Sequence, residues 1–228
     1  MTDSPLAGAG ACVFDAYGTL FDLINPVAAR AAKIGDKAGP LSELWRRKQL
    51  EYSWLRSLMG QHVDFWRVTG DALDFTLAAL EIDDPALRAD LMELYLSIPT
   101  YEEVPEVLNT LKAGKLKTGV LSNGAPVMLT AAINCANIAP DLDVVFSVED
   151  VGVFKPDPRV YQMAVDRLKL DAGDIAFFSS NAWDVAGAAS FGFRAVWCNR
   201  GGAPREQLPG SPVAEVRNLR EILPLLGL

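Results

Sequence analysis

Histidine and cysteine are scarce in this 228-residue sequence, and their scarcity excludes several kinds of site. His62 is the only histidine, so a Ser-His-Asp triad would have to use it, and no second ligand accompanies it to form a zinc site. The cysteines, Cys12, Cys135 and Cys198, lie far apart and are odd in number. This pattern favours reduced thiols in a cytoplasmic protein over a disulfide framework.

Positive charge and long apolar runs are lacking as well. Lys and Arg number 21 against 29 Asp and Glu, and the net charge of −8 argues against a nucleic-acid partner. No basic stretch suggests a membrane surface, and no apolar run reaches the length of a membrane span. Residues 1–5 show no basic region before an apolar one, so we expect no signal peptide. A small molecule remains the expected partner.

What the chain does contain is an alternation of strand and helix patterns in a sequence that is 50% hydrophobic. Apolar runs typical of buried parallel strands occur at 11–14, 117–121, 144–148, 175–178, 194–198 and 213–216. Helical patterns separate most of these runs. We therefore expect an α/β fold with a doubly wound parallel sheet.

Residues 23–100 interrupt this alternation, because their periodicity is helical and they contain no strong strand. The expected helices span 41–59, 64–80 and 85–96, after a turn at Asn25-Pro26 and breakers at Gly39-Pro40. We expect 23–100 to form a helical cap domain inserted after the first strand. The catalytic α/β domain then comprises 1–22 and 101–228.

Polar side chains gather where the expected strands end. These groups are Asp15 to Thr19, Ser122-Asn123, Lys155, and Ser179 to Asp184. Because the carboxyl ends of parallel strands meet at one edge, where open α/β sheets bind ligands, we expect these groups to form one site. Each group alone is also compatible with an ordinary turn or a helix cap.

The stretch Val13 to Asp22, VFDAYGTLFD, resembles the first motif of the haloacid dehalogenase superfamily, in which the acid at the position of Asp15 is a nucleophile. The phosphatases of that superfamily have a second Asp two residues later, where this chain has Tyr17. The sequence instead resembles the (S)-2-haloacid dehalogenase family. The resemblance extends over nearly the whole chain, including 44–46 and 49–55.

This resemblance implies hydrolytic dehalogenation of short (S)-2-haloalkanoic acids to (R)-2-hydroxy acids, with inversion, through a covalent ester on Asp15. A departing halide needs no proton, which fits Tyr17 in place of an acid. Phosphatases also place two Asp residues four apart in their last motif to hold Mg²⁺, where this chain has Ser180 and Asp184. Fewer carboxylates reduce the demand for a divalent cation, so we expect neither a metal nor another cofactor.

The resemblance also implies roles for individual residues. The catalytic set is Asp15, Thr19, Arg46, Ser122, Lys155, Tyr161, Ser179, Asn181 and Asp184. The set that binds substrate and halide is Tyr17, Arg46, Leu50, Phe65, Ser122, Asn123 and Trp183. Within the family, the residue at Arg46 attracts the halide, and the residue at Ser122 binds the substrate carboxylate. Asp184 is the implied partner of Lys155 and a candidate base for the hydrolytic water.

Several alternatives remain open on the sequence alone. Ser122-Asn123 would also serve as a helix cap, Asp184 as a structural acid, and Tyr161 as a core residue. Leu50, Phe65 and Trp183 are equally compatible with ordinary core positions. A Mg²⁺-dependent phosphatase and a catalytically silent small-acid-binding protein are the alternative functions. Exposed aromatics expected on the long cap helix, together with the family habit, predict a homodimer.

Overall fold

The computed structural model describes residues 4–23 and 30–228, so the turn expected at Asn25-Pro26 lies outside the described residues. The strands are β1 Ala11–Phe14, β2 Lys117–Ser122, β3 Val144–Ser147, β4 Ile175–Ser179, β5 Arg194–Cys198 and β6 Ala214–Val216. The helices are α2 Ala31–Ile34, α3 Ala38–Met59, α4 Phe65–Ala79, α5 Pro85–Glu93, α6 Val104–Ala113, α7 Pro126–Cys135, α8 Pro158–Leu168, α9 Ala182–Phe191 and α10 Ile222–Leu226.

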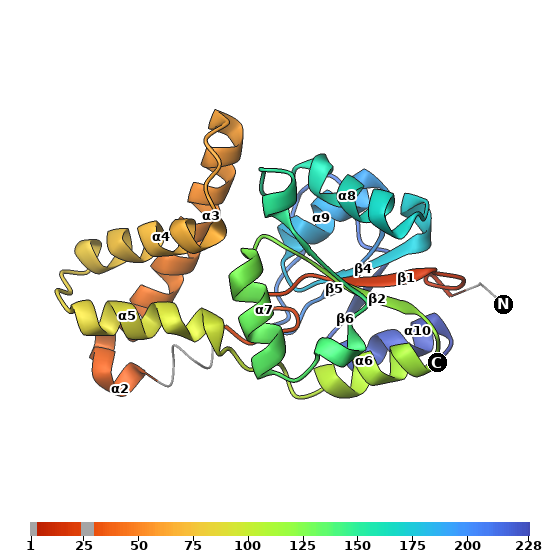
Figure 1. Cartoon of the computed structure of the whole chain (residues 1–228), viewed down its shortest axis with the longest axis horizontal. Helices are drawn as coiled ribbons and strands as arrows, with labels where there is room; N and C mark the ends of the chain where they lie inside the picture. Colours follow the sequence, from red (N-terminus) through yellow and green to blue (C-terminus); the bar gives the residue numbers. More distant parts are fainter. Residues whose placement is uncertain (1–3, 24–29) are drawn as a thin grey trace.

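All six strands form one parallel sheet in the order β3-β2-β1-β4-β5-β6. Figure 1 shows α8 and α9 on one face of this sheet and α6 and α10 on the other. The expected doubly wound α/β fold is therefore confirmed. The chain reverses its direction of winding between β1 and β4, which makes their carboxyl ends the switch point where ligands bind in such sheets.

The centre of the sheet is apolar because its strands are covered on both faces. Every residue of β1 is buried, and the rings of Phe14 and Phe178 stack with centroids 4.8 Å apart on neighbouring strands. Cys12 and Cys198 are buried among these strands, Cys135 is exposed, and all three thiols are free. Burial raises the pKa of the Cys12 thiol to about 12, so this cysteine packs as a small hydrophobic residue.

Helices α2 to α5, here called the helical lobe, gather beside the sheet in Figure 1. The segments by which the backbone enters and leaves the lobe are hydrogen-bonded to each other. The Asp22 amide donates to the Pro99 carbonyl at 2.9 Å, and the Tyr101 amide donates to the Leu20 carbonyl at 3.0 Å. These two hydrogen bonds flank an antiparallel bridge between Phe21 and Thr100, so the lobe is joined to the sheet by two adjacent chain segments.

The long helix α3 begins earlier than predicted. We expected Gly39-Pro40 to break the chain before a helix at 41–59, but the helix includes both residues and begins at Ala38. Pro40 lies in the first turn, where backbone N–H groups have no intrahelical acceptor, so its missing N–H costs no hydrogen bond. Gly60 ends the helix with a left-handed backbone, as predicted.

The exposed apolar residues of α3 are aliphatic, which corrects the expectation of exposed aromatics. Leu58 and Met59 are 84% and 61% exposed, whereas Trp45 is buried and Tyr52 and Trp54 are half-buried. The aromatic rings of this helix turn toward the rest of the lobe and the sheet. Among the described helices, none combines the length and the apolar character that crossing a membrane demands.

Candidate active site

The predicted site residues converge on the switch point of the sheet. Asp15 directly follows β1, Ser179 ends β4, and Asn181 opens the turn into α9. These positions meet because β1 and β4 are neighbours, with Phe14 paired to Phe178. An acid at this edge is held by two strand ends instead of a mobile loop, so its direction is fixed by the sheet.

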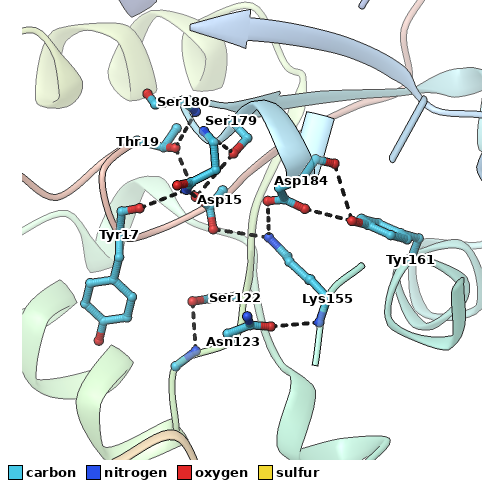
Figure 2. Close-up of polar contacts among 12 residues, drawn as sticks. Asp15, Tyr17, Thr19, Ser122, Asn123, Lys155, Tyr161, Ser179, Ser180 and Asp184 are labelled. Atoms are coloured by element: carbon cyan, nitrogen blue, oxygen red, sulfur yellow. Dashed lines mark hydrogen bonds and ion pairs between the residues drawn. The ribbon is translucent and has the colours of Figure 1, made fainter. Parts of the chain in front are cut away.

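Lys155 occupies the centre of the site, between two carboxylates (Figure 2). Its Nζ lies 3.1 Å from Asp15 Oδ1 and 2.7 Å from Asp184 Oδ2. All three side chains are buried, with Lys155 only 1% exposed. Burial lowers the pKa of Lys155, but the two adjacent carboxylates outweigh it and leave that pKa above its ordinary value. The lysine therefore remains cationic beside Asp15.

The other oxygen of Asp15 accepts hydrogen bonds from three neutral donors. Asn181 Nδ2 donates to Oδ2 at 2.8 Å, Thr19 Oγ1 at 3.1 Å and Ser179 Oγ at 3.3 Å. Thr19 is fixed in turn, because its Oγ1 accepts from the Ser180 amide at 2.8 Å. With one oxygen against the Lys155 ammonium and the other bound by these three donors, the Asp15 carboxylate is held in one orientation.

Asp184 has a different environment, since it is completely buried. Tyr161 donates from its hydroxyl to Asp184 Oδ1 at 2.8 Å, while Lys155 occupies the other oxygen. Burial raises the pKa of Asp184 to about 6, against the opposing attraction of Lys155. Burial and the neighbouring carboxylate raise the pKa of Tyr161, so its hydroxyl stays protonated and donates. Tyr161 is thus both a core residue and a partner of the site.

The helical lobe contributes Arg46, which reaches the sheet edge from α3. Its Nη2 donates to Asn181 Oδ1 at 3.1 Å, and its Nη1 donates to Gln49 Oε1 at 2.7 Å. The Asn181 amide therefore joins Arg46 to Asp15. Among the described residues no carboxylate pairs with Arg46, so its charge remains available to an anion. Arg47, the next residue, is exposed.

Ser122 and Asn123 lie on the far side of Lys155 from Tyr161 and Asp184 (Figure 2). The Ser122 Oγ accepts from the Gly124 amide at 3.0 Å, and Asn123 Oδ1 accepts from the Lys155 amide at 2.9 Å. The helix-cap alternative is wrong, because the N-cap of α7 is Ala125 and no side chain caps that helix. Asn123 instead fixes the backbone that carries Lys155.

The expected apolar pocket residues are only partly brought together. Phe65 is buried and stacks on the Tyr17 ring with centroids 6.3 Å apart, while Trp183 meets Trp54 of α3 edge-on at 5.5 Å. Leu50 is half-buried on α3. A cavity of about 370 Å³ opens beside the site. Its lining includes Arg46, Ser180, Asn181, Trp45 and Tyr95, but not Leu50, Phe65 or Trp183.

Gln49 is a polar residue of the site for which the sequence predicted no role. It is completely buried, and beyond Arg46 it donates to Thr69 Oγ1 at 2.8 Å and to the Tyr95 hydroxyl at 3.1 Å. Its place one helical turn after Arg46 was the available signal, because residues three apart share a helix face. Within the described part of the chain, no cluster of three or more His, Cys, Asp or Glu side chains is arranged to hold a metal ion.

A doubly wound parallel sheet with a buried acid and lysine at its switch point defines a class of α/β protein, and comparison with known proteins identifies it as a class of hydrolases. Residues 9–192 match the family model of haloacid dehalogenase-like hydrolases. The sequence is 44% identical to (S)-2-haloacid dehalogenase 4A of Burkholderia cepacia over 95% of this chain and 94% of that one. The chain belongs to the (S)-2-haloacid dehalogenase family within this hydrolase class.

Solved structures agree with this assignment. A crystal structure of a dehalogenase with an intermediate complex is 42% identical, with a TM-score of 0.95 over 100% of both chains. The L-2-haloacid dehalogenase of Xanthobacter autotrophicus, with chloropropionic acid covalently bound, is 35% identical, with a TM-score of 0.85 over 95% of this chain and 97% of that one. The fold predicted from the sequence is therefore the fold of its relatives.

Proposed function

We propose that this protein hydrolyses short (S)-2-haloalkanoic acids to (R)-2-hydroxy acids, using Asp15 as the nucleophile and no metal. The observation that carries this proposal is the pairing of Asp15 with Lys155 at 3.1 Å, beside non-acidic residues at 17 and 180. A lysine supplies the positive charge that a divalent cation would otherwise provide. The substrate class is supported by the names of the relatives, which are (S)-2-haloacid dehalogenases.

In the first step, Asp15 attacks the α-carbon from the side opposite the halogen. A carbon–oxygen bond forms, the carbon–halogen bond breaks, and the configuration inverts. The contact with the Gly124 amide uses only an acceptor lone pair of Ser122, so its hydroxyl proton is free to bind the substrate carboxylate. Arg46 receives the halide, with Asn123 and Trp183 completing the halide site. Tyr17, Leu50 and Phe65 are the proposed contacts of the α-substituent, although Leu50 and Phe65 do not line the cavity of about 370 Å³.

In the second step, a water molecule attacks the carboxyl carbon of the Asp15 ester. The hydroxy acid leaves with one former Asp15 oxygen, and the water oxygen stays on the enzyme. Thr19, Ser179 and Asn181 donate to the oxygen that gains negative charge, which is electrostatic stabilisation by fixed donors. Asp184, with its raised pKa of about 6, accepts the proton of the water and returns it to the departing oxygen of the hydroxy acid, while Tyr161 and Lys155 hold Asp184 in place.

We also propose that 23–100 forms an inserted cap domain and that 1–22 and 101–228 form the catalytic core. The segments that enter and leave the lobe lie side by side, with the Asp22 amide bound to the Pro99 carbonyl, which supports this division. The exposed apolar end of α3, at Leu58 and Met59, supports a homodimer, which sedimentation of the purified protein would detect. A cytoplasmic location is consistent with three free cysteines.

The test is a pair of assays on the same protein, each with and without EDTA. We expect chloride release from (S)-2-chloropropionate to be unchanged by EDTA, and p-nitrophenyl phosphate to be left intact. Loss of chloride release that Mg²⁺ restores would refute the metal-free mechanism. Phenolate release that requires Mg²⁺ would identify a phosphatase, and binding of the acid without release of chloride would identify a silent binding protein.

A further inference from the structure

His62, the only histidine of the chain, lies in the turn between α3 and α4 and does not contact the catalytic residues. Its Nε2 lies 2.9 Å from Oε2 of Glu149, which belongs to a short 3-10 turn directly after β3. The contact therefore joins the helical lobe to the sheet.

The second oxygen of Glu149 binds the same region of the lobe. Oε1 accepts from the amide of Phe65 at 3.2 Å, at the first residue of the 15-residue helix α4. A carboxylate is favoured at this end of a helix, where free amides and the helix dipole are both positive. One glutamate thus holds the histidine and the helix start together, with both of its oxygens in use.

A third cross-link runs through the residue before Lys155. The amide of Phe154 donates to Ser57 Oγ in the last turn of α3 at 2.9 Å. The Phe154 ring is buried between the rings of His62 and Phe65, with centroid distances of 4.7 and 5.9 Å. We call Ser57, His62, Phe65, Glu149 and Phe154 the turn latch. Its contacts tie the α3–α4 turn to the segment that ends at Lys155.

We propose that Glu149 is a positioning residue for the dehalogenation reaction, acting through the turn latch on Lys155 and Phe65. This inference rests on the proposed function. Phe154 is covalently joined to Lys155, whose Nζ lies between Asp15 and Asp184. Phe65 packs on Tyr17, in the loop that follows the nucleophile. Moving the latch therefore moves the ammonium and one wall of the substrate site together.

The neighbouring acid supplies a matched control for this proposal. Asp150 lies on the same 3-10 turn, but it pairs with Arg167 of α8 at 2.9 Å, and the two side chains are 44% and 50% exposed to solvent. Glu149→Ala and Asp150→Ala each remove one carboxylate from one turn. Only the first breaks contacts to the lobe.

The experiment compares these two variants with the unmodified protein by steady-state kinetics on (S)-2-chloropropionate. Small displacements of catalytic groups reduce rates strongly, so we expect Glu149→Ala to lower kcat about tenfold. We expect Asp150→Ala to leave kcat unchanged. Glu149→Gln, which keeps an oxygen for the Phe65 amide, should recover part of the loss. A Glu149→Ala variant that is less stable to urea but keeps its full kcat would overturn the proposal.

Hydrogen–deuterium exchange makes the outcome independent of turnover. In Glu149→Ala, the peptides that cover 57–65 and 150–156 should both exchange faster, and in Asp150→Ala neither should. If the unmodified protein released no chloride, the proposed function would fail, and exchange would still decide whether Glu149 holds the Lys155 segment. Faster exchange in only one of the two peptides would contradict a latch that links them.

Discussion

The sheet edge and the helical lobe contribute to the site in opposite ways. At the sheet edge, the buried Asp15 and Asp184 each pair at hydrogen-bond distance with the buried Lys155. From the lobe, Arg46 is half-buried and held by the neutral amides of Gln49 and Asn181. Buried charges need fixed partners, because leaving one unpaired is costly. A cation held only by amides, in contrast, keeps its charge free for an anion that arrives and leaves.

The largest effect should follow from changing the nucleophile at the sheet edge. Asp15→Asn keeps the size of the side chain but removes its negative charge, so we expect kcat to fall by about 10⁴-fold or more. Chloride release from (S)-2-chloropropionate measures this loss, and circular dichroism checks that the fold is intact. A variant that keeps a substantial rate would show that Asp15 is not the attacking group.

Isotopic oxygen separates the covalent route from direct attack by water in the same protein. In a single turnover in H₂¹⁸O with excess enzyme, the hydroxy acid should carry no label, and the peptide that contains Asp15 should carry one ¹⁸O. This follows because water attacks the carboxyl carbon of Asp15 and not the α-carbon. Labelled product with an unlabelled peptide would mean that Asp15 acts as a base.

On the lobe side, Arg46→Ala should lower kcat by about 10²-fold, the usual loss when one group that stabilises developing negative charge is removed. Arg47→Ala is the control, because Arg47 is adjacent and exposed and should tolerate alanine with little change. Chloride release by the two variants measures the difference. Equal rates would place Arg46 outside the site.

The buried carboxyl group of Asp184 can be tested by measuring protein stability instead of turnover. Its pKa in the folded protein is raised to about 6, so the folded state binds the proton more tightly than the unfolded state does. Protonated Asp184 therefore adds to the free energy of unfolding. This stabilisation is fully present at low pH and is lost as pH rises through about 6. Relative to Asp184→Asn, the native protein should lose about 2 kcal/mol of unfolding free energy between pH 4 and pH 6. Urea denaturation of both proteins at several pH values measures this loss. If their free energies of unfolding changed with pH in parallel, the raised pKa of Asp184 would be refuted.

The smallest effect is expected at the support of Arg46. Gln49→Leu keeps the packing of α3 but removes the acceptor of Arg46 Nη1 and a donor to Thr69 and Tyr95, so kcat should fall about tenfold. Ser53→Ala is a suitable control, since Ser53 is buried one turn later and its hydroxyl bonds only the backbone carbonyl of Gln49. If both variants behave alike, Gln49 has only a packing role.

The parts of the fold that were predictable from the sequence are those where pattern and local chemistry agree. The apolar run 11–14 ends on an acid, and β1 ends directly before Asp15. The start of α3 was mispredicted because Gly39-Pro40 breaks a helix interior but not a first turn. Ser122-Asn123 was ambiguous because a cap and a loop have the same local sequence, and only the structure shows that α7 is capped at Ala125 while Asn123 binds the Lys155 amide.

Contacts between residues distant in sequence were harder to predict. The spacing of Gln49 from Arg46 indicates a shared helix face, but the burial of Gln49 depends on Thr69 and Tyr95 from other helices. Glu149 likewise reads as surface charge after a strand, and nothing in its own neighbourhood indicates His62, 87 residues earlier. Asp15, Lys155 and Asp184 were found through the family resemblance of their motifs, since their pairing also joins distant segments.

The pairing of β1 with β4 has a consequence for how the protein is made. Asp15 leaves the ribosome early, but Lys155 follows 140 residues later and the Asn181 donor 166 residues later. The helical lobe is complete long before either partner exists, whereas β1 must wait for β4. Contacts this distant in sequence form slowly, because a long loop must close before they are made. The whole sequence of the lobe is therefore made before the site can form, and Asp15 gains Lys155 and Asn181 only in the last third of synthesis.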